Sequence, residues 1–277
     1  TFQNIFSNKT LYKNIQILEA GHYFEIDLSQ KNIKKTQYWD FDFSSNREVV
    51  KDEREYTEEL DRLFSQAVKR QLVSDVPIGS YLSGGMDSGS ITAITSNIFQ
   101  KSDNFLKTFT VGFDMSSASG LELSFDERSK AEYMSYKFKT EHYEMVLKSG
   151  DMERCLPEFA SHLEEPRVGQ SYPNYYAAKL ASKFVKVVLS GAGGDELFAG
   201  YPWRYYKATN NKNFDEYIDK YYKFWQRLVP NKEIKKILSP ISDEIKDLKT
   251  RDIFANVFNS LPKPQTPEDY INHSLYF

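Results

Sequence analysis

The sequence predicts an α/β protein in which helices flank a parallel, doubly wound sheet. Apolar runs of strand length alternate along the chain with segments whose apolar residues follow helical spacing. Strands that alternate with helices in this way form parallel sheets, because each helix carries the chain back along the sheet. Two of the strand-like runs also end in small residues followed by an acid. Ligands bind at the carboxyl ends of such strands, so this edge of the sheet is the expected site.

The predicted sheet begins after a first helix, which starts near residue 54 and places Leu60, Leu63 and Leu72 at helical spacing. Its strands are rich in β-branched and aromatic residues, and the helix after the first strand carries an isoleucine stripe. The expected strands are 76–82, 105–113, 142–147 and 185–191, and the expected helices are those carrying Ile91, Ile94 and Ile98, then 127–138, 151–162 and 173–183.

The two ends of the chain depart from this pattern. Residues 1–45 predict short strands and turns, with one turn near Ser29–Asn32, and are too short for a core of their own. Residues 46–53 are charged and are typical of a linker. Residues 54–277 form the main predicted domain, which beyond residue 200 is rich in aromatic residues and lysine and predicts mostly helix.

Composition excludes several classes of protein. The 277 residues are 40% hydrophobic and 27% charged, as in a globular protein, and the net charge of -3 gives no general attraction to nucleic acid or anionic membranes. No apolar run approaches the ~20 residues of a membrane helix, and the first residues do not resemble a signal peptide. Cys155 is the only cysteine, so an internal disulfide is excluded and we expect it in a helix core. A cytoplasmic location is therefore expected.

The first strand-end loop reads Ser83-Gly84-Gly85-Met86-Asp87-Ser88, and the second is 190–196. Glycines let backbone N–H groups approach a bulky anion, and a following helix turns its positive end toward that anion. A carboxylate among these donors would repel phosphate unless it holds a Mg²⁺ ion that the phosphate shares. The first loop therefore predicts a cradle for pyrophosphate and Mg²⁺.

Two common nucleotide-binding motifs do not fit these loops. Gly79 and Gly84 have the glycine spacing of a Walker A motif, but Gly85-Met86 stands where Lys-Ser/Thr is needed. The run 191–193 begins a dinucleotide fingerprint, but Glu196 occupies the place of the third glycine. Each loop alone is compatible with a simple strand-to-helix turn. The recurrence of one pattern after two strands argues for a shared ligand.

The segment "SGGMDS" resembles the PP-loop of the ATP pyrophosphatase superfamily. Together, "VPIGSYLSGGMDS" (76–88) and "VVLSGAGGDELFAGY" (187–201) resemble the synthetase domain of glutamine-dependent asparagine synthetases. The opening "LYKNIQILEAGHYFEID", followed by "YWDF", is similar to the last strands of that family's glutaminase domain. The resemblance runs through residues 10–205.

This resemblance implies a sheet of the adenine nucleotide alpha-hydrolase type. It implies that residues 1–45 are the C-terminal remnant of a glutaminase (Ntn-type) domain and that 54–277 are a synthetase domain incomplete at its C-terminus. The family's catalytic N-terminal cysteine has no counterpart at Thr1, and a phosphate-facing lysine is expected beyond Phe277. We therefore expect the chain to be a piece of a longer enzyme.

The reaction implied by the resemblance is ATP-dependent amide formation. A carboxylate, foremost aspartate, attacks the α-phosphate of ATP, pyrophosphate leaves, and glutamine-derived ammonia takes up the acyl group. The implied partners are the glutaminase domain of the same full-length chain and these small molecules, with a homodimer left open. Asp87 and Asp195 are the implied catalytic residues and Mg²⁺ ligands. The implied ATP-binding residues are Tyr81, Leu82, Ser83, Gly84, Gly85, Asp87, Ser88, Val111, Ser190 and Gly191.

Ala192 departs from the family, which usually carries an acid at this position. The substitution leaves open a ligase of the same fold that acts on another carboxylate, such as a peptide or a sugar-linked acid. A nucleotide-binding or scaffolding domain without turnover is a third interpretation. The intact pair Asp87 and Asp195 argues against that interpretation.

Overall fold

The computed structural model describes residues 8–43, 52–116, 126–164, 171–206, 210–226 and 229–277. They divide into two compact units. The first, here called the sheet unit, comprises residues 48–163 and 168–198. The second, here called the helical unit, comprises residues 1–47, 164–167 and 199–277.

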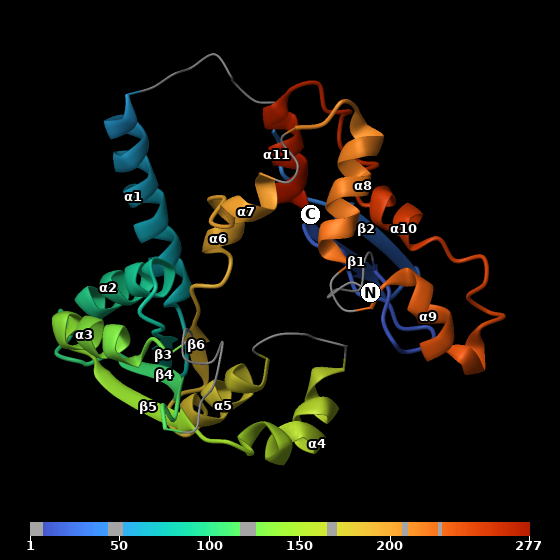
Figure 1. The fold of residues 1–277 in the computed structure, drawn as a ribbon. Coiled ribbons are helices and arrows are strands. Elements are labelled where there is room, and N and C mark those ends of the chain that lie inside the picture. The colour runs from blue at the N-terminus through green and yellow to red at the C-terminus, as the bar shows by residue number, and fades with distance from the viewer. Residues whose placement is uncertain (1–7, 44–51, 117–125, 165–170, 207–209, 227–228) are drawn as a thin grey trace. The chain divides into compact units, whose positions relative to one another are not determined.

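The sheet unit contains a four-stranded parallel sheet, which confirms the predicted fold class (Figure 1). Its strands are β3 (Ile78–Tyr81), β4 (Lys107–Phe113), β5 (Glu141–Leu147) and β6 (Val187–Leu189), in the order β5-β4-β3-β6. The chain thus runs outward from β3 through β4 to β5 and returns to the opposite side of β3. This reversal puts a topological switch point between β3 and β6, where ligands bind in open α/β sheets.

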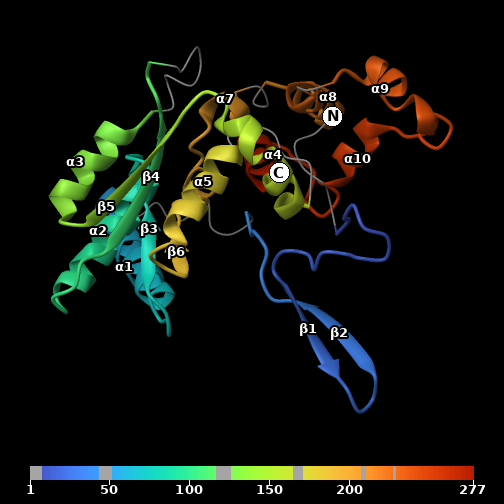
Figure 2. The same ribbon diagram turned by 90° about the horizontal axis from the view of Figure 1, so that it is seen from below.

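Helices cover both faces of this sheet. Figures 1 and 2 show α2 and α3 on one face and α5 on the other, close to β4. The predicted helices are present, with ends that differ by a few residues. Cys155 is buried in the fourth of them, as predicted. The helices are α1 (Glu53–Gln71), α2 (Met86–Gln100), α3 (Arg128–Phe138), α4 (Asp151–Leu163), α5 (Ser171–Ala181) and the four-residue α6 (Gly194–Leu197).

The face that α2 buries differs from the predicted isoleucine stripe. Its fully buried residues are small or hydroxylated and include Ser88, Thr92 and Thr95, whereas the isoleucines are only partly buried. Small side chains let the helix approach the strand, and Thr92 Oγ1 lies 3.2 Å from Ser80 Oγ on β3. The Thr92 hydroxyl is thereby paired, whereas the buried hydroxyl of Thr95 has no hydrogen-bond partner among the described residues. On the other face, Phe109 packs in the apolar core beneath α5.

The N-terminal part of the helical unit contains a β-hairpin. Strands β1 (His22–Asp27) and β2 (Asn32–Gln37) are antiparallel, and the turn between them falls close to the predicted position. The Asp27 carboxylate accepts hydrogen bonds from the backbone N–H groups of Ser29 and Gln30, which stabilises this turn. Whether this hairpin belongs to a glutaminase remnant stays a prediction.

The C-terminal part of the helical unit is helical, as predicted, and its core is aromatic. Tyr217 and Tyr221 are fully buried and pack with Phe254 and Phe258. No helix among the described residues combines the length and apolar character needed to cross a membrane. The helices are α7 (Pro202–Tyr205), α8 (Phe214–Trp225), α9 (Asn231–Ile237), the 3₁₀ helix η2 (Ser239–Ile241), α10 (Thr250–Asn256) and α11 (Pro267–Tyr276).

Candidate functional site

The first loop connects β3 to α2 and is held by its own serines. The Ser88 hydroxyl accepts a hydrogen bond from the backbone N–H of Ser83 at 3.1 Å, and the two serine hydroxyls lie 3.0 Å apart. The Ser83 hydroxyl in turn accepts from the N–H of Gly85 at 3.3 Å. Gly84 has a φ of 80°, and a Cβ there would lie 2.5 Å from the Cβ of Lys130. The loop therefore requires glycine at this position and has a fixed form.

Helix α2 begins at Met86 directly after this loop. Its N-cap residue Gly85 supplies no side-chain hydrogen bond, so N–H groups of the first helical turn stay available to a ligand. The positive end of a helix of 15 residues lies at the same place. Free backbone donors and a helix dipole together favour an anion such as phosphate.

The second loop follows β6 and rests on the first. A Cβ on Gly191 would lie 2.6 Å from the backbone nitrogen of Ser88, so only glycine permits this approach. The loop itself is held by the N–H of Ala192, which donates to Ser190 Oγ at 3.2 Å. The two loops thus meet at the switch point between β3 and β6.

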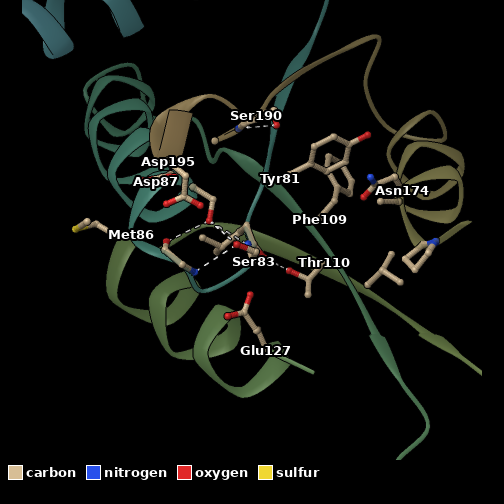
Figure 3. A pocket seen from close by; sticks show the side chains of 18 of the residues that line it. Tyr81, Ser83, Met86, Asp87, Phe109, Thr110, Glu127, Asn174, Ser190 and Asp195 are labelled. Atoms are coloured by element: carbon tan, nitrogen blue, oxygen red, sulfur yellow. Dashed lines mark hydrogen bonds between the residues drawn. The ribbon is translucent and has the colours of Figure 1, made fainter. Parts of the chain in front are cut away.

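The two acids come from adjoining loops, and both line the same cavity (Figure 3). A Cβ on Gly194, the residue before Asp195, would overlap the Asp87 carboxylate, so this carboxylate lies close to the second loop. Two neighbouring carboxylates repel each other, and a cation between them removes this repulsion. The described residues contain no group of three or more His, Cys, Asp or Glu placed to hold a metal ion. The pair fits Mg²⁺, which binds through one or two carboxylates and takes its other ligands from water and phosphate.

The loops open into a cavity of ≈ 750 Å³ at the carboxyl ends of the strands. All but one of the predicted site residues line it, and the remaining one, Gly84, shapes the first loop instead. What they bind stays a prediction. The predicted residues in the lining are Tyr81, Leu82, Ser83, Gly85, Asp87, Ser88, Val111, Ser190, Gly191 and Asp195.

Ala192, singled out as a departure from the family, also lines the cavity. At this position, where the resemblance leads us to expect an acid, the cavity is therefore lined by a methyl group. Burial raises the pKa of Tyr81, so its hydroxyl stays neutral at physiological pH. Among the described residues of the lining, none is lysine, arginine or histidine.

Several lining residues were not predicted from the sequence. Phe109, Thr110 and Phe113 belong to β4, and the hydroxyl of Thr110 donates a hydrogen bond to the carbonyl of Leu82. The apolar run 105–113 gave a signal for these, because residues at a strand's carboxyl end face such a site. The other unpredicted lining residues come from helices. Met86 begins α2, Glu127 directly precedes α3, and α5 supplies Pro173, Asn174 and Ala177. No motif marks the positions at α3 and α5.

Comparison with known proteins gives matches over most of the chain. Residues 59–277 match the model of one protein family, asparagine synthase. A Methanocaldococcus jannaschii protein named as asparagine synthetase (glutamine-hydrolyzing) 2 is 35% identical over 193 residues, which cover 69% of this chain and 35% of that protein. Asparagine synthetase (glutamine-hydrolyzing) 1 of Bacillus subtilis is 32% identical over 206 residues, which cover 73% of this chain and 30% of that protein.

The chain spans about a third of the length of these relatives. The family match nevertheless covers both strand-end loops, the sheet and the C-terminal helices. The chain therefore belongs to the asparagine synthase family.

Proposed function

We propose that the sheet unit binds Mg²⁺ and ATP and catalyses the AMP-forming activation of a carboxylate, which ammonia then converts to an amide. The observation that carries the proposal is the convergence of the two loops, each with one acid, on a single cavity at the switch point. The names of the relatives support aspartate as the carboxylate and glutamine as the source of ammonia. The protein is then an ATP-dependent carbon–nitrogen ligase.

The first loop is the proposed binding site of the phosphates. Ser83, Gly85 and Ser88 supply hydroxyl and backbone donors, and the first turn of α2 supplies further N–H groups. Tyr81, Leu82 and Val111 on the strands, with Ser190 and Gly191 on the second loop, frame the adenosine part. ATP would thus lie across the switch point.

Asp87 and Asp195 are the proposed catalytic residues and would hold Mg²⁺ together. The bound ion would supply positive charge to the phosphates. In the reaction, a carboxylate oxygen of the substrate attacks the α-phosphorus, and the bond to pyrophosphate breaks. Ammonia then attacks the acyl carbon, and AMP leaves. The residues of the cavity hold the reacting groups together and offset charge, which supplies most of the rate increase for such reactions.

The test is pyrophosphate release by the full chain with ATP, Mg²⁺ and a panel of carboxylates. Asp87→Asn and Asp195→Asn should keep the fold and lose most of this activity, because a neutral amide is a poor Mg²⁺ ligand. Circular dichroism of both variants controls for folding. Near-normal turnover by either variant at saturating magnesium would remove that residue from the proposed site.

Ala192 favours a second candidate, a ligase that acts on a larger carboxylate. Its methyl group leaves room where an acid would narrow the cavity. If the substrate is aspartate, Ala192→Glu should preserve or raise asparagine formation from aspartate, ATP and ammonium. If a larger acyl group occupies this space, the new carboxylate should block it, because an unpaired buried charge is costly and repels phosphate. A folded, ATP-binding wild type that forms no asparagine would favour the second candidate.

The remaining features of the proposal concern the whole protein. The glutaminase remnant at 1–45, the linker at 46–53, a partner glutaminase domain, a homodimer and a cytoplasmic location stay predictions. Light scattering of the full chain tests the dimer, and glutamine-dependent ammonia release tests the glutaminase partner.

A further inference from the structure

The proposed ATP site carries an imbalance of charge. Asp87, Glu127 and Asp195 line the cavity, whereas its described lining contains no basic side chain. ATP adds more negative charge, which one Mg²⁺ ion offsets only in part. Phosphates that leave as pyrophosphate also gain charge as the bond breaks, so a cation near them stabilises the transition state. A basic residue next to the cavity would add its charge to that of the lysine expected beyond Phe277.

We propose that Lys130 binds the β- and γ-phosphates of ATP and the departing pyrophosphate; this inference rests on the proposed function. Lys130 lies on α3, and its stem starts against the first loop, since a Cβ on Gly84 would lie 2.5 Å from the Lys130 Cβ. Its ammonium lies 4.0 Å from the Glu127 carboxylate. Glu127 lines the cavity and faces the first loop in Figure 3. The ammonium of Lys130 thus lies close to a carboxylate that lines the cavity.

The position of Lys130 in its helix also calls for an explanation. Helix α3 begins at Arg128 and has no acidic residue in its first turn. A cation there opposes the helix dipole, which favours negative charge at this end. Glu127 stands at the N-cap position, yet its side chain does not cap the helix. The ion pair with Glu127 offsets this cost in part, and a phosphate ligand would offset it further.

Arg128 shares this unfavourable position but has a structural role. Its guanidinium donates two hydrogen bonds to the Asp126 carboxylate, at 2.8 Å each, and one to the carbonyl of Phe113 at 2.9 Å. The same ion pair holds the pKa of Asp126 below its usual range. Arg128 therefore anchors α3 to the end of β4 and is committed to that task.

Lys130 is free to move in a way that Arg128 is not. Its side chain is 69% exposed, and its distance to Glu127 is at the limit of an ion pair. A lysine ammonium is a point charge on a flexible stem, which suits phosphates whose position changes during the reaction. Glu127 would hold the ammonium at the rim before ATP binds.

Lys137 is the matched control for the charge. It lies on the same helix, two turns further on, and its ammonium sits 5.6 Å from the centre of the Tyr133 ring. Residues seven apart in a helix lie on the same face. Both Lys130→Met and Lys137→Met therefore remove one positive charge from the same face of α3. Lys130 lies next to the first loop, whereas Lys137 lies two turns away from it.

The experiment measures binding by calorimetry in the full chain, with the Mg²⁺ complex of α,β-methylene-ATP and, separately, with AMP. Lys130→Met should weaken binding of the ATP analogue about tenfold or more, the usual effect of losing one charged hydrogen bond. AMP, which lacks the β- and γ-phosphates, should bind as before. Lys137→Met should leave both affinities unchanged, and Lys130→Arg should keep most of the affinity for the analogue.

The outcomes separate this inference from the proposed function. A wild type that binds neither ligand would overturn both. A wild type that binds the analogue, with a Lys130→Met variant that binds it equally well, would overturn the role of Lys130 and leave the ATP site standing. If Lys130→Met weakens the binding of AMP and of the ATP analogue equally, the substitution has a general effect on the cavity, and the proposed role of Lys130 is also overturned. If Lys130→Met fails to fold, Lys130→Gln repeats the comparison with a polar side chain.

Discussion

The two strand-end loops lie next to each other but differ in internal structure. The first is held by hydrogen bonds among Ser83, Gly85 and Ser88 and leads into a helix of 15 residues. The second is held by the hydrogen bond from Ala192 to Ser190, with a long one of 3.4 Å from the Gly194 N–H to the Gly191 carbonyl, and leads into a helix of four. The first loop is therefore held mainly by its own hydrogen bonds before a ligand arrives. The second depends more on its contact with the first loop, at Gly191.

This difference fits the tasks proposed for the loops. Phosphate binding through backbone donors works best when those donors are already in place, because no ordering cost remains. In the proposed function, the second loop instead brings the acid Asp195 and the small side chain of Ala192 to the cavity. The same kind of substitution in each loop should therefore lower the free energy of unfolding by different amounts.

The largest effect is expected from Gly84→Ala in the first loop. The alanine would have to adopt a φ of 80° and would overlap the backbone and side chain at the start of α3. Strain and overlap each cost on the order of 1–3 kcal/mol, so the free energy of unfolding should fall by about 3 kcal/mol. Urea unfolding measures this change. A loss below about 1 kcal/mol would mean that the first loop adapts as readily as the second.

A smaller effect is expected from Ser88→Ala. The hydroxyl of this buried serine accepts from the Ser83 N–H and donates to the Gly85 carbonyl, and its loss leaves both without that partner. A hydrogen bond contributes about 1 kcal/mol net, so the loss of both should lower the free energy of unfolding by about 2 kcal/mol. Ser190→Ala is the control in the second loop and should cost under about 0.5 kcal/mol, because Ser190 is exposed. Equal losses in the two variants would contradict the contrast between the loops.

A smaller effect than that of Gly84→Ala is expected from Gly193→Ala, the corresponding substitution in the second loop. Gly193 has a φ of 105°, but nothing lies within 4 Å of the position of a Cβ. Only backbone strain remains, so the free energy of unfolding should fall by about 1 kcal/mol. Thermal unfolding of Gly193→Ala and Gly84→Ala side by side tests the difference. A more severe loss at position 193 would show that the second loop is also tightly fixed.

The sequence was sufficient to predict the strands and helices of the sheet unit. The runs 105–113 and 142–147 correspond to β4 and β5. The buried strand β4 leaves a nearly continuous apolar signal, whereas β5 lies at the sheet edge and is marked by its aromatic and β-branched residues. The order of the strands was not predicted, because apolar spacing reports burial and not which strands pair. The stripe of Ile91, Ile94 and Ile98 indicated the helix α2 but not its fully buried face, because close approach to β3 requires small residues there.

The residues of the candidate site also fall into those that the sequence predicted and those that it did not. Residues in the two glycine-rich loops could be placed at one cavity, because strand ends of a parallel sheet share an edge. Glu127 and Asn174 were missed, since each begins a helix far along the chain and only the fold brings it to the cavity. Lys130 was missed for a further reason. Its position next to Gly84 depends on how α3 packs, which spacing alone does not reveal.

The return of the chain from β5 to β6 determines when the sheet can be completed during protein synthesis. Ile78 pairs with Val187, so the edge of β3 that will hold β6 stays open while the ribosome produces everything between them. An open edge strand is a template for pairing with other chains. A nascent or truncated chain that stops before the second loop would therefore lack half of the cavity and expose a surface prone to aggregation. Once β6 has docked, a nucleotide that touches both loops would hold that edge closed.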